Sequence, residues 1–295
     1  MSNYVLSCCS VADLSPEFMA KRNIHFASLH FFIDGKEYDD DMGKTLSSAD
    51  FYQAMKDGAE VSTSQVNVDE FTCYFEQFLS AGQDVLHLAL SSGLSGSYNS
   101  ARIAAEILSE KYPNRKLYVV DSLAASAGDG LLMDTLADLR DNGADIDELH
   151  RWVETNKKKM HHWFTASDLT WFVKGGRVTK AAGWFGTVLK ICPVLNVDHM
   201  GRLIPRFKIR GKQNALKELV NQMKEHASDG KDYSGKCFIS NSACYEDARV
   251  VADEIEAYFP HLNGKVEIFN IGTTIGSHTG PGTTALFFWG DERTN

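Results

Sequence analysis

The sequence has 295 residues, of which 43% are hydrophobic and 23% charged, an ordinary globular composition with room for two domains. The formal net charge of −9 argues against a nucleic-acid-binding protein, because phosphate recognition needs a basic surface. No apolar run approaches the roughly 20 residues that a membrane-spanning helix needs, so no stable membrane insertion is expected.

Strands that alternate with helices are predicted along the first half of the chain. The predicted strands are 4–8, one within 24–32, 84–90 and 117–120, and the predicted helices are 48–57, one through 71–78, 99–108, 124–139 and 147–158. Such alternation is typical of an α/β fold with a parallel sheet. We therefore expect an N-terminal α/β domain at residues 1–159.

The composition changes at the lysine run 157–159, after which the chain is rich in aromatic residues and glycine. Strands are predicted at 191–197, 202–210, 236–240, 266–270 and 285–289, and helices at 214–225 and 246–258. This pattern favours a second α/β domain at residues 160–295.

A turn rich in serine and glycine, residues 91–97, joins the predicted strand 84–90 to a predicted helix. Glycine lets a backbone approach a ligand closely, and the free N–H groups at a helix start favour an anion. A second hydroxyl-rich stretch, 61–65, precedes another helix. We expect both stretches at the carboxyl edge of the parallel sheet, where such sheets bind ligands. The candidate donors are Thr63, Ser64, Ser92 and Ser95, unless these residues only form loops and helix caps.

Two potential cations lie in glycine-rich segments: Arg177 follows Gly175-Gly176, and His278 lies within residues 276–282. Cations and hydroxyl donors that converge on one point suit a carboxylate or a phosphate. The alternatives are a surface arginine after a turn and a structural histidine with its hydrogen bonds satisfied.

Residues 93–97 approach the G-x-S-x-G motif of serine hydrolases, with Ser97 in place of the last glycine. A hydrolase with Ser95 or Ser92 as nucleophile, His278 as base and Asp121 as the orienting group therefore stays an alternative. The sequence contains neither G-x-x-x-x-G-K-S/T nor G-x-G-x-x-G, and no cofactor is expected.

The six cysteines form no C-x-x-C pair and no Cys/His cluster with zinc spacing. The adjacent His161 and His162 have diverging side chains and no acidic partner at ligand spacing, so we expect them at the surface or an interface. No metal site is predicted. The N-terminus lacks the basic and apolar regions of a secretion signal, which favours a cytoplasmic protein with free thiols.

Seven short stretches occur in an order that covers nearly the whole chain. They are residues 63–65 (Thr-Ser-Gln), 90–98 (Leu-Ser-Ser-Gly-Leu-Ser-Gly-Ser-Tyr), 120–122, 175–178, 189–195, 201–205 and 275–282. Together they resemble the DegV family of bacterial fatty-acid-binding proteins. The first strand departs from the family's usual Thr-Asp-Ser, with Cys8-Cys9-Ser10, and Val66-Asn67-Val68 replaces the usual prolines. These departures concern a kinase partnership more than lipid binding.

The resemblance implies a two-domain α/β carrier, not an enzyme, that holds one long-chain fatty acid between its domains. It implies that Thr63 and Ser95 contact the carboxylate and that Arg177 and His278 lie near the head group. Some members present the acid to a separate fatty acid kinase, which forms an acyl phosphate for phospholipid synthesis. A lipid-responsive sensor or scaffold is a further alternative.

Simple magnitudes separate the source of affinity from the source of orientation. About 15 buried methylenes contribute roughly 12 kcal/mol, against association costs of ~4–15 kcal/mol. A neutral hydrogen bond adds only about 1 kcal/mol. The apolar slot therefore supplies the affinity, and the hydroxyl groups decide which end of the ligand goes where. The acyl-pocket candidates come from the apolar stretch 163–195: Phe164, Trp184, Phe185, Leu189 and Ile191.

Overall fold

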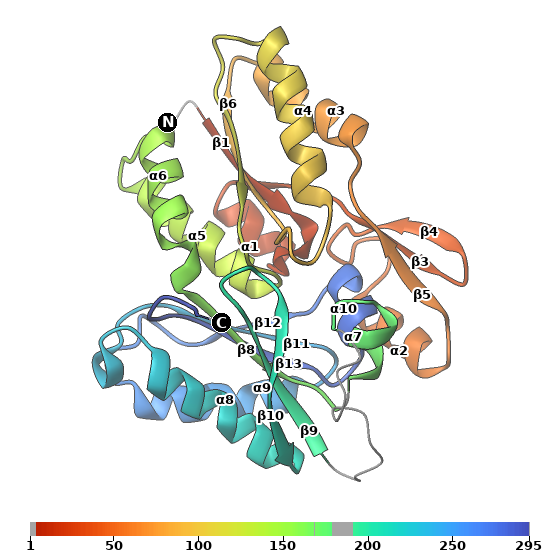
Figure 1. Cartoon of the computed structure of the whole chain (residues 1–295), viewed down its shortest axis with the longest axis vertical. Helices are drawn as coiled ribbons and strands as arrows, with labels where there is room; N and C mark the ends of the chain where they lie inside the picture. The colour runs from red at the N-terminus through yellow and green to blue at the C-terminus, as the bar shows by residue number, and fades with distance from the viewer. Residues whose placement is uncertain (1–3, 168, 179–190, 295) are drawn as a thin grey trace.

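The computed structural model of the chain has an α/β fold with three β-sheets (Figure 1). It describes residues 4–167, 169–178 and 191–294. The pocket candidates Trp184, Phe185 and Leu189 lie outside the described residues. Within the described residues, no helix is long and apolar enough to cross a bilayer.

The first sheet has four parallel strands in the order β2-β1-β6-β7, as the alternating pattern predicts. Helices α3 and α4 pack on one face, and α5 and α6 pack on the other. The elements are β1 (Tyr4–Cys9), β2 (Ile24–Ala27), β6 (Asp84–Ala89), β7 (Leu117–Asp121), α3 (Val68–Ser80), α4 (Ser97–Lys111), α5 (Ala127–Asp141) and α6 (Ile146–Asn156). Asn67 and Asp145 start α3 and α6 with reciprocal capping hydrogen bonds, which fixes where these helices begin.

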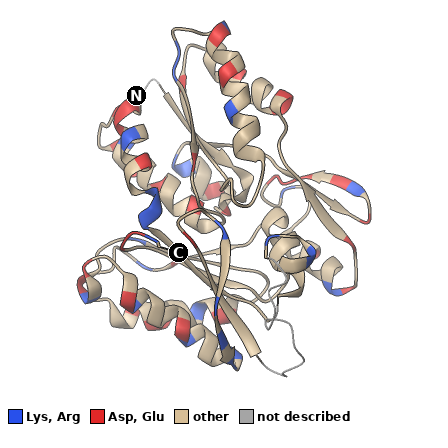
Figure 2. Ribbon diagram, in the orientation of Figure 1, with Lys and Arg blue, Asp and Glu red and all other residues tan. Residues whose placement is uncertain are grey.

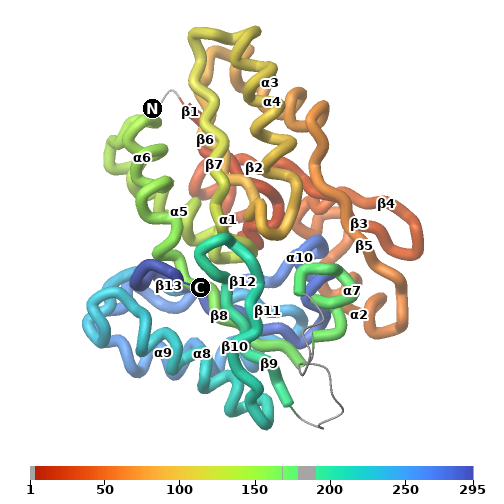
Figure 3. Tube along the Cα trace, in the orientation of Figure 1, coloured from red at the N-terminus to blue at the C-terminus, as the bar shows by residue number. Residues whose placement is uncertain are grey.

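The second sheet is mixed, with the strand order β10-β9-β8-β13-β11-β12. Strands β11 and β12 run parallel, and the other neighbouring pairs are antiparallel. Helices α8 and α9 cover one face of this sheet. The sheet and these two helices form the lower half of the molecule in Figure 3. The elements are β8 (Met160–Thr165), β9 (Ile191–Val197), β10 (Leu203–Arg210), β11 (Cys237–Asn241), β12 (Glu267–Asn270), β13 (Thr284–Trp289), α8 (Lys212–His226) and α9 (Tyr245–Tyr258).

The third sheet is a small antiparallel one with the order β4-β3-β5. It contains β3 (His30–Ile33), β4 (Lys36–Asp39) and β5 (Val61–Ser64), and α10 (Thr273–Thr279) packs against it beside α2 (Ser48–Lys56). Residues 61–64 pair with β3, so they belong to this small sheet and not to the parallel one. The end of the stretch still lies at the carboxyl edge of the parallel sheet, as predicted, because Gln65 contacts Gly96 and Ser100 beyond β6. Phe31 and Ile33 of β3 form a satellite core with α2.

The remaining elements are short. They are α1 (Pro16–Lys21), α7 (Thr170–Lys174) and the 3-10 turns η1 (Ser10–Ala12), η2 (Lys157–Lys159) and η3 (Gly230–Asp232). Charged side chains gather on the outer helices and on the small sheet, whereas the strands of the two large sheets carry few of them (Figure 2). All six cysteines are free.

Helix α5 lies between the two large sheets, with β1 on one side and β8, β11 and β13 on the other (Figure 1). Ten of its 15 residues are buried. A Cβ atom on Gly128 would lie 2.2 Å from His162 Nε2, and one on Gly130 would lie 2.7 Å from the Ala12 carbonyl oxygen. The two glycines therefore allow the helix to approach both neighbours closely. One hydrophobic core runs across both sheets through this helix.

The expectation that His161 and His162 lie at the surface or an interface is wrong. Both are buried in β8, with 4% and 2% of their surface exposed. Strand β8 is covered by α5 on one face and by α8 on the other, so the side chains on both faces are buried. The last strand of the parallel sheet ends at Asp121, and the first strand of the mixed sheet begins at Met160. The predicted domain boundary between residues 159 and 160 stays a prediction.

Asp129 in α5 is completely buried, and the Ser122 hydroxyl is the hydrogen-bonding group beside its carboxylate. Burial raises the pKa of Asp129 to about 8, whereas an aspartate in an unfolded chain titrates near pH 4. Between these values the folded protein holds a proton that the unfolded chain has released. The free energy of unfolding therefore falls as the pH rises through this range.

Asp129→Asn keeps the shape of the side chain and removes its ionisation. Urea unfolding measures the free energy of unfolding of the variant minus that of the wild type. We expect this difference to be larger at pH 8 than at pH 5 by at least about 1 kcal/mol. The highly exposed Asp232 provides the control Asp232→Asn. A stability difference for Asp129→Asn that does not change with pH would contradict the burial of a titrating carboxyl group.

Candidate functional site

A cavity of about 380 Å³ lies where the three sheets meet, a size typical of small-molecule sites. Its apolar lining comes largely from the mixed sheet, from the end of β6 and from α10 and its flanks. The apolar side chains are Leu29, Leu90, Leu94, Ala125, Phe164, Phe172, Val197, Leu203, Ile271, Ile275, Ala285 and Phe287. Polar side chains from β5, the α4 start, the segment after α7, and α10 complete the wall.

Three of the polar residues contact one another although they are far apart in the sequence. Thr63 Oγ1 on β5 lies 2.8 Å from His278 Nε2 on α10. Arg177 Nη1 lies 3.5 Å from His278 Nδ1, and its Nε donates to the Leu94 carbonyl oxygen at 3.2 Å. Because Leu94 precedes Ser95, these contacts connect the small sheet, α10 and the β6–α4 turn.

Ser95 lies in that turn, immediately before α4. The Ser97 N–H donates to Ser95 Oγ at 3.2 Å, and the two hydroxyl oxygens are 3.0 Å apart. Gly96, the N-cap residue of α4, also lines the cavity, so the first N–H groups of this 15-residue helix lie at the cavity wall. This arrangement favours a negatively charged group.

Two glycines allow the polar groups to approach closely. A Cβ atom on Gly96 would lie 2.2 Å from Gln65 Oε1, and one on Gly175 would lie 2.2 Å from His278 Nδ1. Gln65 Nε2 donates to Ser100 Oγ at 3.1 Å, which holds the end of β5 against α4. The Thr-Ser-Gln stretch and the Ser-Gly turn are therefore joined by a direct side-chain contact.

The two basic side chains of the site, His278 and Arg177, differ in their charge at pH 7. Burial, and then the positive charge of Arg177, lower the pKa of His278 to about 4, so the ring is neutral at pH 7. Burial lowers the pKa of Arg177 as well, but a guanidinium stays protonated at any physiological pH. Among the described residues, the cavity wall thus carries one fixed positive charge and several neutral hydrogen-bonding groups, which suits a single anionic head group.

The structure brings most of the sequence-predicted residues together. Thr63, Ser64, Ser95, Arg177, His278 and Phe164 all line the cavity.

Ser92 is exposed instead, and its backbone N–H donates to Asp121 Oδ1 at 3.0 Å. The N–H groups of Leu94 and Ser95 both bond to the Ser91 carbonyl oxygen, and this tight turn leaves Ser92 on its outer side. Ser92 therefore does not line the cavity, contrary to the prediction.

Ile191 begins β9 and is not among the residues that line the cavity, whereas Val197 at the other end of the same strand is.

The Ser–His–Asp arrangement of the hydrolase alternative is not assembled. His278 is hydrogen-bonded to Thr63 rather than to Ser95. Asp121 accepts hydrogen bonds from the N–H groups of Ser92 and Leu123, so it holds the turn and does not orient His278.

Sequence reasoning missed several polar residues of the wall, among them Ser126 and His162. Ser126 precedes α5 after the end of β7, the same strand-to-helix position that singled out Ser95. His162 follows His161 in a strand, so one ring faces the cavity and the other faces away. His162 Nε2 accepts from the Ala125 N–H at 3.3 Å, which ties β8 to the start of α5.

A family model described as an uncharacterised protein of the DegV family matches residues 9–291. The chain belongs to the DegV family. A DegV domain-containing protein of Clostridium perfringens is 38% identical over 293 residues, covering 99% of both chains. A DegV lipid-binding protein of Thermotoga maritima has the same fold, with a TM-score of 0.85 and 27% identity over the whole of both chains.

A second Thermotoga maritima structure, described as revealing a fatty-acid-binding function, has a TM-score of 0.83 and 26% identity. It covers 98% of this chain and the whole of its own. These DegV relatives confirm the two-domain α/β fold.

We expect the His278 ring to stay neutral as the pH falls from about 8 to about 5, because its pKa lies near 4. Arg177→Gln removes the neighbouring positive charge and should raise this pKa, while burial still keeps it below the usual value of 6.5. A pH titration of the histidine ring signals by NMR measures both, with the exposed His261 as an internal reference. Protonation of His278 near pH 6.5 in the wild type would contradict the buried geometry.

Proposed function

We propose that this DegV protein binds one long-chain fatty acid in the cavity and acts as a carrier without a chemical step of its own. The observation that carries the proposal is a single cavity that joins a cluster of hydrogen-bonding groups and one arginine to an extensive apolar wall. The carboxylate would contact Thr63, Ser64 and Ser95, with Arg177 and His278 beside it. The acyl chain would lie against apolar residues such as Phe164, Phe172 and Phe287.

The neutral state of His278 supports this orientation. A neutral ring and hydroxyl groups can hold a carboxylate by hydrogen bonds, and Arg177 would supply the compensating charge. The two similar Thermotoga maritima proteins, described as lipid-binding and as fatty-acid-binding, support the choice of ligand.

We also propose that the bound acid is presented in the cytoplasm to a separate fatty acid kinase, which would phosphorylate the carboxylate. This step rests on the family resemblance. The departure at Cys8 and Cys9 does not alter the cavity wall, because both thiols are buried in the core and Cys9 Sγ lies 3.7 Å from His87 Nε2. A pull-down with and without bound acid separates such a carrier from a lipid-responsive scaffold.

The direct test is mass spectrometry of the purified protein under native and then denaturing conditions. We expect about one equivalent of long-chain fatty acid to be released on denaturation. A protein that stays free of lipid after incubation with fatty acid would refute the proposal. Turnover of acyl esters that disappears in Ser95→Ala would favour the hydrolase instead.

The double variant Thr63→Val, Ser95→Ala removes two neutral hydrogen-bonding groups from the proposed head-group site. Each contributes about 1 kcal/mol, so we expect affinity for a fatty acid to fall roughly tenfold to thirtyfold. Affinity for the corresponding fatty alcohol should change much less, because the apolar contacts remain. Competition with a fluorescent fatty acid measures both ligands.

The exposed Ser92 provides the matched control Ser92→Ala, which should bind as the wild type does. Equal losses for acid and alcohol in the double variant would show that Thr63 and Ser95 do not contact the carboxylate.

A further inference from the structure

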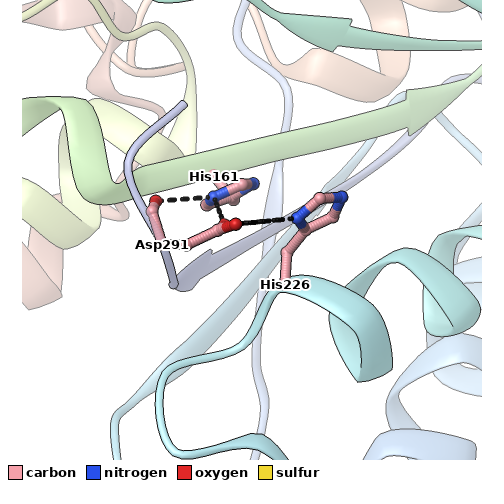
Figure 4. Close-up of side chains that lie close together, drawn as sticks. All are labelled: His161, His226 and Asp291. Carbon is pink, nitrogen blue, oxygen red and sulfur yellow. Dashed lines mark hydrogen bonds and ion pairs between the residues drawn. The ribbon is translucent and has the colours of Figure 1, made fainter. Parts of the chain in front are cut away.

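Two histidines and an aspartate converge on the opposite face of strand β8 from the cavity (Figure 4). His161 belongs to β8, His226 ends α8, and Asp291 follows β13. His161 Nε2 lies 2.9 Å from Asp291 Oδ1, and His226 Nδ1 lies 3.2 Å from the same oxygen. One nitrogen or oxygen from each residue lies within 4.8 Å of the other two.

We propose that His161, His226 and Asp291 form a binding site for a divalent transition-metal ion of the zinc type. Imidazole nitrogens and a carboxylate oxygen are the donors that such ions take in proteins. With bonds of about 2.0–2.2 Å, the donor atoms of a tetrahedral zinc site lie roughly 3.4 Å apart. The two separations from the Asp291 oxygen, 2.9 and 3.2 Å, are near this value. Imidazole lone pairs lie in the ring planes and the two rings are nearly parallel, so the partly exposed His226 ring would have to turn before both nitrogens point at one ion.

Stacking of aromatic rings holds the two histidines in place. The His161 ring lies between Phe288 and His226, at centroid distances of 5.1 and 5.0 Å, and the planes are nearly parallel. The His226 ring stacks in turn near Trp163, at 5.8 Å. The stack fixes the His161 ring, and metal binding would require the His226 ring to leave its stacked position.

His161 Nε2 is the ring nitrogen that would bind the metal. Nε2 now faces both the backbone oxygen and the carboxylate of Asp291, so binding would move the ring proton to Nδ1.

The surrounding charges are mixed. Glu225 and Glu292 line the same hollow of about 250 Å³ and could supply a further oxygen, or leave the fourth position to water. Arg206 and Arg293 line it too. Arg293 Nη2 is engaged by the carbonyl oxygens of Leu123 and Lys157, at 3.0 and 3.3 Å. Its hydrogen bonds are thus directed to the backbone, away from the proposed ligands.

This site is separate from the proposed fatty-acid function. His162 lines the cavity, whereas His161 faces the other side of the strand. A metal ion here would join β8, the end of α8 and the C-terminal segment at one point. The proposal can therefore fail without affecting fatty-acid binding.

The test is titration of the full-length, chelator-treated protein with Co²⁺, followed by visible absorption and then by displacement with Zn²⁺. We expect one equivalent to produce an intense band typical of four or five coordination. His226→Ala and Asp291→Ala should each weaken binding by about tenfold or more. His226 and Asp291 are partly exposed, so these two changes avoid the buried His161.

The matched control is His261→Ala, because His261 forms a loose exposed pair with Asp232 at 3.9 Å. This variant should bind Co²⁺ as the wild type does. Urea unfolding without metal shows whether each variant is folded. Absence of the band in the wild type, or equal Co²⁺ affinity in the wild type and both folded ligand variants, would overturn the proposal.

Discussion

The burial of helix α5 between the two large sheets is the packing constraint on which the rest of the molecule depends. Side chains of the parallel sheet and of the mixed sheet meet in one core across this helix. Gly128 and Gly130 remove the side chains that would otherwise hold the sheets apart. Since the start of α5 also reaches the cavity, at Ala125 and Ser126, the same packing brings the strand ends of both sheets to one ligand site.

Close backbone approach also builds the polar part of the site. Gly96 admits the side chain of Gln65, and Gly175 admits the ring of His278. Groups from four separate stretches of chain thereby surround one small volume, with one arginine as the fixed charge. A head group held in this way is oriented more than it is tightly bound, because each neutral hydrogen bond adds only about 1 kcal/mol. Under the proposed function, the apolar wall would supply most of the affinity for a long acyl chain.

Much of the fold could be predicted because burial imposes clear periodicities. The alternation of apolar strands with amphipathic helices predicted the parallel sheet, and most helices lie near their expected positions. Hydroxyl groups and glycines at turns predicted Thr63, Ser95, Arg177 and His278 as site residues, and all four line the same cavity. The residues 273–279 gave no helical pattern because glycine and threonine dominate them, yet they form α10.

The misses have physical reasons. Ser92 and Ser95 are alike in the sequence, and only the hydrogen bonds of the turn decide which of them faces the cavity. The two neighbouring histidines carry no local sign of a strand covered on both faces. Asp291 is 130 residues from His161, so spacing in the sequence could not reveal their contact. Such groupings depend on the order of strands in the mixed sheet, which local patterns do not encode.

The most direct measurement is a crystal structure of the protein with a fatty acid that carries bromine on its terminal carbon, with the bromine located by anomalous scattering. The account predicts the carboxylate within hydrogen-bonding distance of Thr63 and Ser95, and the bromine among the apolar side chains of the same cavity. A carboxylate elsewhere, or a bromine signal beside Thr63, would contradict it.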